Sequence, residues 1–171
     1  MELNGYKLIV RKDREDTTDG RGGGILIFSK SELRCHEIEV HCDIIQRATV
    51  QIKLEDCDLN LHAIYRSPNS SVENNSKIND FIRSLTVNSI VVGDFNHPSV
   101  NWELQTSNQQ HSREFMEAVN DAFLTQHVDF PTHDGGNLLD LVLSNIPNRV
   151  RQVIEKGKLG NTILLISMET H

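Results

Sequence analysis

The sequence has no long apolar run and no beginning typical of a secreted protein. No stretch of its 171 residues approaches the roughly 18 consecutive apolar residues that a membrane helix needs. Residues 1–4 do not open the basic-then-apolar pattern of a signal peptide. These absences predict an intracellular protein, nuclear or cytoplasmic, that is not secreted and has no membrane among its partners.

Cysteine is scarce, and an odd total of three in a chain without a secretion signal is typical of reduced thiols. Cys35-His36 and His41-Cys42 have the residue types of a zinc site. On a continuous strand, however, Cys35 and His41 face one way, while His36 and Cys42 face the other. A tetrahedral site would need a break in that strand, so zinc is not predicted.

Positive charge is also in deficit, because 17 Lys and Arg stand against 24 Asp and Glu, a net charge of −7. This balance argues against broad, charge-driven wrapping of nucleic acid. It does not exclude a nuclease, because metal-binding carboxylates make an active site acidic. Arg149 and Arg151 share one face of an expected strand, where they could meet a phosphate backbone but solvent is the expected neighbour. The histidines in loops or near helix ends are expected to be solvated; these are His97, His111, His127 and His133.

The length and the 37% apolar and 24% charged fractions are those of one globular domain, which we expect to cover residues 1–171. Short β-branched runs predict strands at Lys7–Arg11, Gly24–Lys30, Ile38–Ile45, Ala48–Leu54, Leu59–Arg66, Ser89–Val92, Leu138–Ser144, Val150–Glu155 and Ile163–Ser167. Residues 19–23 predict a turn between the first two strands. Helical spacing runs from Ile78 to Leu85, and again from Ser112 to Leu124 with Ser112 as N-cap. Strands that outnumber the helices between them favour an α/β sandwich with mixed sheets.

The most informative segment is Gly93-Asp94-Phe95-Asn96, which directly follows the apolar strand at Ser89–Val92. Two positions apart on a strand, Asp94 and Asn96 would lie on one face. The carboxylate can bind a metal or orient water, and the amide can donate to a phosphate oxygen. The alternative is that both side chains merely cap a turn.

Two further residues have chemistry to offer. Asp140 lies in an otherwise apolar run, and a buried carboxylate is costly unless it is paired or ligates a cation. It is instead solvated if it lies near the start of the strand. Tyr65 ends the strand that begins at Leu59, where its hydroxyl can reach a phosphate or its ring can simply pack.

Six segments of the sequence form an ordered set of motifs. They are residues 20–27, 63–68, 90–98, 101–102, 130–132 and 139–145. Together they resemble the endonuclease/exonuclease/phosphatase superfamily, which has the DNase I-like fold. The closer likeness is to the endonuclease domain of non-LTR retrotransposons of the LINE or jockey kind. The resemblance implies two mixed, largely antiparallel sheets flanked by helices, and DNA as the partner.

The resemblance also implies roles for individual residues. Asp94 and Asn96 match the pair that positions water and contacts the scissile phosphate, with Asp94 a weak candidate ligand for Mg²⁺. Tyr65 matches a tyrosine that hydrogen-bonds that phosphate, and Asp140 matches the acid that orients a catalytic histidine. The implied chemistry is Mg²⁺-assisted hydrolysis of a phosphodiester.

The sequence departs from the family pattern at both ends. The family's first two strands, which carry an Asn and a metal-binding Glu, belong upstream of the part matched by Gly5–Ile9, so we expect a domain incomplete at its N-terminus. The family's Ser-Asp-His motif is also altered, because Asn161-Thr162 runs directly into Ile163. Either the whole motif is absent after Asn161, or Thr162 replaces its Ser and only the Asp and the His are missing. These losses predict a truncated, inactive copy in which Mg²⁺ binding is doubtful. The alternatives are an active phosphodiesterase or phosphatase with a rearranged site, and a non-catalytic module that binds protein or nucleic acid.

Overall fold

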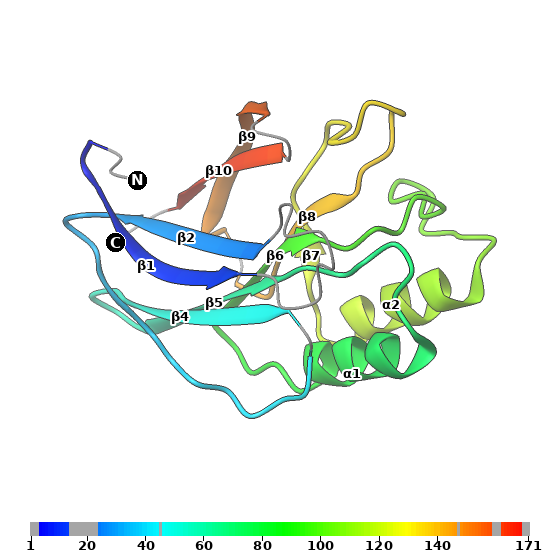
Figure 1. The fold of residues 1–171 in the computed structure, drawn as a ribbon, viewed down its shortest axis with the longest axis horizontal. Coiled ribbons are helices and arrows are strands. Elements are labelled where there is room, and N and C mark those ends of the chain that lie inside the picture. The colour runs from blue at the N-terminus through cyan, green and yellow to red at the C-terminus, as the bar shows by residue number, and fades with distance from the viewer. Residues whose placement is uncertain (1–3, 14–23, 45, 147, 159–161, 169–171) are drawn as a thin grey trace.

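A six-stranded mixed sheet forms the centre of the fold (Figure 1). The computed structural model describes residues 4–13, 24–44, 46–146, 148–158 and 162–168. The strand order in this sheet is β3-β4-β5-β6-β8-β7, and β5 and β6 form its parallel pair. The strands are β3 (Arg34–Glu37), β4 (Arg47–Lys53), β5 (Asp58–Ile64), β6 (Ser89–Asp94), β7 (Thr125–Gln126) and β8 (Asp140–Ser144).

Two antiparallel pairs of strands form a second layer on one side of this sheet. The first pair is β1 (Tyr6–Asp13) with β2 (Gly24–Lys30), and the second is β9 (Val150–Lys158) with β10 (Thr162–Met168). Side chains of both pairs, including Val10 and Val153, pack in one apolar cluster with the central sheet. Figure 1 shows the two helices on the opposite side.

The alternation of side chains along the central strands separates two cores. In β6, Ile90 points into the cluster below the strand pairs, whereas Val91 points into the cluster below the helices. In β8, Leu141 and Leu143 contact the helical cluster, and Val142 lies in the other. A strand that is apolar on both faces is what a sheet covered on both sides requires.

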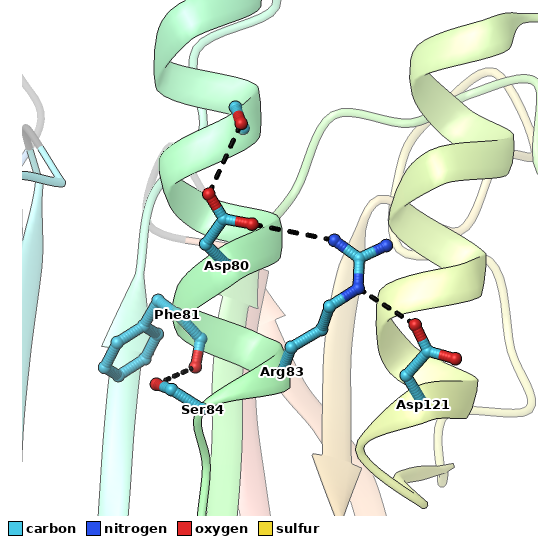
Figure 2. A network of polar contacts seen from close by, with 6 residues as sticks. Asp80, Phe81, Arg83, Ser84 and Asp121 are labelled. Atoms are coloured by element: carbon cyan, nitrogen blue, oxygen red, sulfur yellow. Dashed lines mark hydrogen bonds and ion pairs between the residues drawn. The ribbon is translucent and has the colours of Figure 1, made fainter.

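Helices α1 (Val72–Arg83) and α2 (Gln110–Asp121) pack side by side. The first begins at Ser71, whose hydroxyl accepts a hydrogen bond from the backbone N–H of Asn74 at 3.1 Å, as an N-cap does. Figure 2 shows Arg83 of α1 reaching across to Asp121 of α2, with Nε 2.9 Å from Oδ2. Neither helix is long and apolar enough to cross a membrane, among the residues that the structure describes.

The expected α/β sandwich with DNase I-like architecture is confirmed, but some local predictions are wrong. The strand predicted at Ile38–Ile45 is absent from the described residues 38–44, because β3 already occupies the edge of β4. Two short strands, β3 and β7, were not expected. Ser112 is not the N-cap of α2, which begins after Gln109. The turn expected at residues 19–23 lies outside the described residues.

Candidate active site

The parallel strands β5 and β6 end at the same edge of the central sheet. Their register pairs Ala63 with Val92, so the chain after β5 runs beside the end of β6. The backbone N–H of Arg66 donates to the carbonyl of Asp94 at 2.8 Å and extends the pairing past the last residue of β5. This contact brings Tyr65, Arg66 and Asp94 to one end of the sheet.

Gly93 permits the close approach of these two strands. Its φ is +145°, and a Cβ placed there would lie 1.7 Å from the carbonyl oxygen of Ile64. No other residue type fits this position without moving the backbone of β5. The glycine before Asp94 is therefore a structural requirement of the strand end that carries the candidate site.

Asp94 and Asn96 face each other across a tight turn. Strand β6 ends at Asp94, and Asn96 adopts a left-handed conformation with φ of +48°. Its backbone N–H donates to Asp94 Oδ1 at 3.1 Å, and its side-chain Nδ2 donates to the carbonyl of Arg66 at 2.8 Å. A turn brings the two side chains together, and not the alternation of a strand that the sequence predicted. The hydrogen bond from the Asn96 N–H to the Asp94 carboxylate is a capping contact of the kind that the alternative interpretation described.

Asp140 lies directly opposite Asp94. The antiparallel register of β6 and β8 pairs these two residues, which places their Cβ atoms about 5 Å apart. Asp140 is half-buried and is the first residue of β8. The buried hydroxyl of Thr132 accepts hydrogen bonds from the backbone N–H groups of Leu139 and Asp140, both at 2.9 Å, and fixes the start of the strand.

The electrostatics of this edge follow from two carboxylates in a partly desolvated place. Burial, together with the like charge of Asp140, raises the pKa of Asp94 to about 6, while the N–H of Asn96 and nearby His133 act to lower it. Like charges that are held close together favour a cation or a shared proton between them. The pair is therefore poised to take up positive charge.

Tyr65 follows β5 at the same edge, half-buried, and its backbone N–H donates to the carbonyl of Gln46 at 3.1 Å. The strand ends two residues earlier than the sequence predicts, at Ile64, so Tyr65 lies in the connection to α1. Its position beside Arg66 places it near the carboxylates by sequence and register. The structure therefore brings Asp94, Asn96 and Asp140 together, and it places the backbone of Tyr65 at the same edge.

The donor set of this edge fits Mg²⁺, which takes oxygen ligands and is often held through one or two carboxylates together with phosphates of the substrate. Asp94 and Asp140 would be the residues that hold it. Within the described residues, no group of three or more His, Cys, Asp and Glu side chains gathers as a metal site. Any ion at this edge would thus take most of its ligands from water or from a bound phosphate.

Two contributors to this edge were not identified from the sequence. Arg66 is 2% exposed and bonds to the turn of Asp94 and Asn96. Thr132 lies in residues 130–132, one of the segments that resemble the family, but the sequence does not predict its hydrogen bond to the backbone of Asp140. An arginine directly after an apolar strand and before a Ser-Pro loop was the available signal for the first.

Several other candidates lie elsewhere or behave differently. His97 is buried rather than solvated: its Nδ1 lies 3.0 Å from Ser112 Oγ, and its ring stacks on Phe115. Arg149, expected to meet solvent, instead pairs with Asp56 at 2.5 Å. The cysteines of the rejected zinc set separate as well, because Cys35 packs against the cluster of the strand pairs and Cys42 against the helical cluster. Asn161, part of the altered motif, lies outside the described residues.

Comparison with known proteins places the chain in a family. Residues 59–161, more than half of the chain, match the family model described as endonuclease-reverse transcriptase. The fold is similar to the endonuclease domain of TRAS1, a telomere-specific non-LTR retrotransposon, with a TM-score of 0.70 and 12% identity over 98% of this chain and 80% of that one.

A second solved structure with a similar fold is an endonuclease/exonuclease/phosphatase family protein from Leptotrichia buccalis C-1013-b. Its TM-score is 0.62 and its identity 16%, over 96% of this chain and 72% of that one. No curated protein sequence matches the chain. The chain belongs to the endonuclease-reverse transcriptase family, within the DNase I-like superfamily.

Proposed function

We propose that the chain is a retrotransposon endonuclease-like domain that binds a DNA phosphodiester with Mg²⁺ at the Asp94 edge, and that it does not cleave DNA by itself. The observation that carries the proposal is the pairing of Asp94 with Asp140 beside the Asn96 turn. The printed description of TRAS1 as a retrotransposon endonuclease domain supports the choice of DNA.

Each residue has a part in this proposal. Asp94 and Asp140 hold the cation, Asn96 offers a side-chain N–H to a phosphate oxygen, and Tyr65 offers its hydroxyl to the same group. Bound Mg²⁺ would stabilise negative charge on the phosphate and on the leaving oxygen. Because the two carboxylates repel each other, binding of a cation between them relieves a cost that the folded chain already bears.

The proposed lack of cleavage rests on the missing acid–base group. Where the family pattern has Ser-Asp-His, Asn161-Thr162 runs directly into Ile163, so the Asp and the His are missing. A positioned acid or base typically contributes about 10²- to 10⁴-fold in rate. With two carboxylates as the described metal donors, little remains to compensate for that loss.

A plasmid-nicking assay tests the proposed lack of cleavage. Supercoiled plasmid is incubated with Mg²⁺ and either the chain or an Asp94→Asn variant, which keeps the shape of the side chain but removes its charge. We expect no nicking above buffer from either protein. Mg²⁺-dependent nicking that disappears in Asp94→Asn would contradict inactivity and support the active, rearranged phosphodiesterase.

Calorimetry tests the proposed binding separately. Mg²⁺ is titrated into the chain with and without a short DNA duplex present. We expect binding that is stronger with DNA and that is lost in Asp94→Asn, because the phosphate completes the set of ligands. If Mg²⁺ and DNA bind equally well to both proteins, or not at all, the proposed site is wrong and a module that binds another partner is favoured.

A further inference from the structure

Arg66 occupies an unusual place for a charged side chain. It is 2% exposed, although it follows Tyr65 at the edge of the sheet where the candidate site lies. Burial of a guanidinium is costly unless its N–H groups are hydrogen-bonded. The partners of those groups therefore indicate what the residue does.

The guanidinium joins helix α1 to the site turn. Its Nε donates to Asn75 Oδ1 at 2.8 Å, and one terminal nitrogen donates to the carbonyls of Asn96 at 3.0 Å and Phe95 at 3.3 Å. A weaker contact of 3.4 Å reaches the carbonyl of Ser67. These acceptors are amide oxygens, so none of these hydrogen bonds reaches a carboxylate. The charge of Asp94 nevertheless acts on the guanidinium and opposes the lowering of the Arg66 pKa by burial.

Arg66 and Asn96 are bonded in both directions. The guanidinium donates to the backbone carbonyl of Asn96, while the carbonyl of Arg66 accepts from Asn96 Nδ2 at 2.8 Å. The reciprocal bonds fix both the left-handed backbone of Asn96 and the direction of its amide. A lysine ammonium lacks the planar fork needed to reach Asn75 and the turn at once.

We propose that Arg66 is the positioning residue of the site: it orients the Asn96 amide and supplies a buried positive charge beneath the edge where an anionic phosphate would bind. The orientation stands on the hydrogen bonds alone. The contribution to phosphate binding rests on the proposed function.

Three variants separate these two contributions. Arg66→Lys keeps a positive charge but breaks the two-sided link. Asn75→Asp keeps an acceptor for Arg66 Nε and places a negative charge against the guanidinium. Arg149→Lys is the matched control, because Arg149 is also mostly buried but pairs with Asp56, away from the turn.

Two readouts are compared in ¹H–¹⁵N spectra of the full chain: the side-chain amide signal of Asn96, and the affinity for a short DNA duplex with Mg²⁺. We expect Arg66→Lys to shift the Asn96 signal and weaken binding about tenfold, the size expected for losing a hydrogen bond to a charged group. Asn75→Asp leaves the Asn96 signal in place and weakens binding several-fold. Arg149→Lys changes neither readout.

The outcomes distinguish this proposal from the proposed function. If the wild-type chain binds no DNA, the proposed function fails, and the Asn96 signal alone decides whether Arg66 positions the turn. An unchanged Asn96 signal in Arg66→Lys overturns the positioning role. Wild-type affinity in Asn75→Asp overturns the role of the buried charge, and this test of the charge holds even if Arg66→Lys fails to fold.

Discussion

Two arginines, Arg47 and Arg66, lie near the same edge of the central sheet and both face helix α1. Arg47 bonds to Thr49 Oγ1 at 2.8 Å and to the carbonyl of Val40, and its guanidinium carbon lies 5.2 Å from the ring centre of Phe81. Arg66 bonds to Asn75 and to the turn that carries Asp94 and Asn96.

The two arginines also have similar effects on neighbouring histidines. Burial, with the charge of Arg47, lowers the pKa of His62 to about 4, and burial, with the charges of Arg66 and His111, lowers that of His97 to about 3. The two arginines differ in how many of the buried polar atoms around them have a hydrogen-bond partner. Around Arg47, the buried Arg47 Nε and His62 Nε2 have no hydrogen-bond partner among the described residues.

The comparison teaches that an arginine packed between helix α1 and the sheet, whether half-buried like Arg47 or buried like Arg66, does not identify a site by itself. Both arginines contact a residue of α1, and each acts on a histidine whose pKa is lowered. What distinguishes Arg66 is the identity of its acceptors, because two of them, the carbonyls of Phe95 and Asn96, belong to the turn that carries the candidate site. The following predictions test this difference.

The largest effect is expected from Gly93→Ala, which disturbs the backbone just before the turn to which Arg66 is hydrogen-bonded. The new Cβ would meet the carbonyl of Ile64, so we expect a loss of unfolding free energy above about 4 kcal/mol or failure to fold. Gly136→Ala is the control, because Gly136 also has positive φ, +77°, but nothing lies within 4 Å of its added Cβ. Urea unfolding should show a loss there of about 1 kcal/mol. Equal losses would refute the steric argument.

Replacement of each arginine by methionine compares directly how much Arg47 and Arg66, with their hydrogen bonds, contribute to stability. Arg66→Met leaves the acceptors on Asn75, Phe95 and Asn96 unpaired in a buried place, and should cost about 3 kcal/mol. Arg47→Met loses fewer bonds and removes an imperfectly satisfied group, and should cost about 1 kcal/mol. The measurement is urea unfolding at neutral pH. A larger loss for Arg47→Met would reverse the comparison.

The pH dependence of stability tests whether His62, beside Arg47, is buried in its neutral form. His62 is neutral when folded because its pKa is about 4, whereas the unfolded chain binds a proton near pH 6.5. Between these values the unfolded state holds more protons, so stability falls as the pH falls, by about 3 kcal/mol at most. Asp94 acts in the opposite sense, since its pKa of about 6 lies above the ordinary value of 3.8.

The contribution of Asp94 cancels when wild type is compared with His62→Gln. We expect the wild-type chain to lose more stability than the variant between pH 6.5 and pH 4. Unfolding free energies at four pH values across this window provide the measurement. Parallel curves for the two proteins would show that His62 is not buried in the neutral form.

The smallest effect is expected at the surface, where Arg83 pairs with Asp121 across the two helices (Figure 2). The two side chains are 38% and 59% exposed, so solvent screens the pair. A double-mutant cycle of Arg83→Gln and Asp121→Asn should give a coupling energy below about 1 kcal/mol. A coupling energy as large as the loss of stability in Arg66→Met would mean that a buried arginine contributes no more to stability than an exposed one in this protein.

The sequence predicted the strands well where local patterning dominates. β2 begins and ends at the predicted residues, and β4 within one residue of the predicted ones. Prediction failed where a distant partner decides: Ile38–Ile45 has strand-like composition, yet β3 already pairs with β4. Ser112 resembles an N-cap, but its hydroxyl is taken by His97, fifteen residues earlier.

The candidate site was predictable as a set of residues but not as an arrangement. Asp94, Asn96 and Asp140 were chosen for their chemistry and motif. That Asp140 lies opposite Asp94 depends on the register of β6 and β8, which no local pattern encodes. The role of Arg66 depends on acceptors up to thirty residues away and was invisible for the same reason.

The most direct test of the central claim is a titration of the ¹⁵N-labelled chain with a short DNA duplex and Mg²⁺, followed residue by residue. We predict that the amide signals that move most belong to residues 93–97 and 139–141, and that they stay in place in Asp94→Asn. Changes concentrated around Arg149 and β9 instead, or identical changes in Asp94→Asn, would contradict a phosphodiester site at the Asp94 edge.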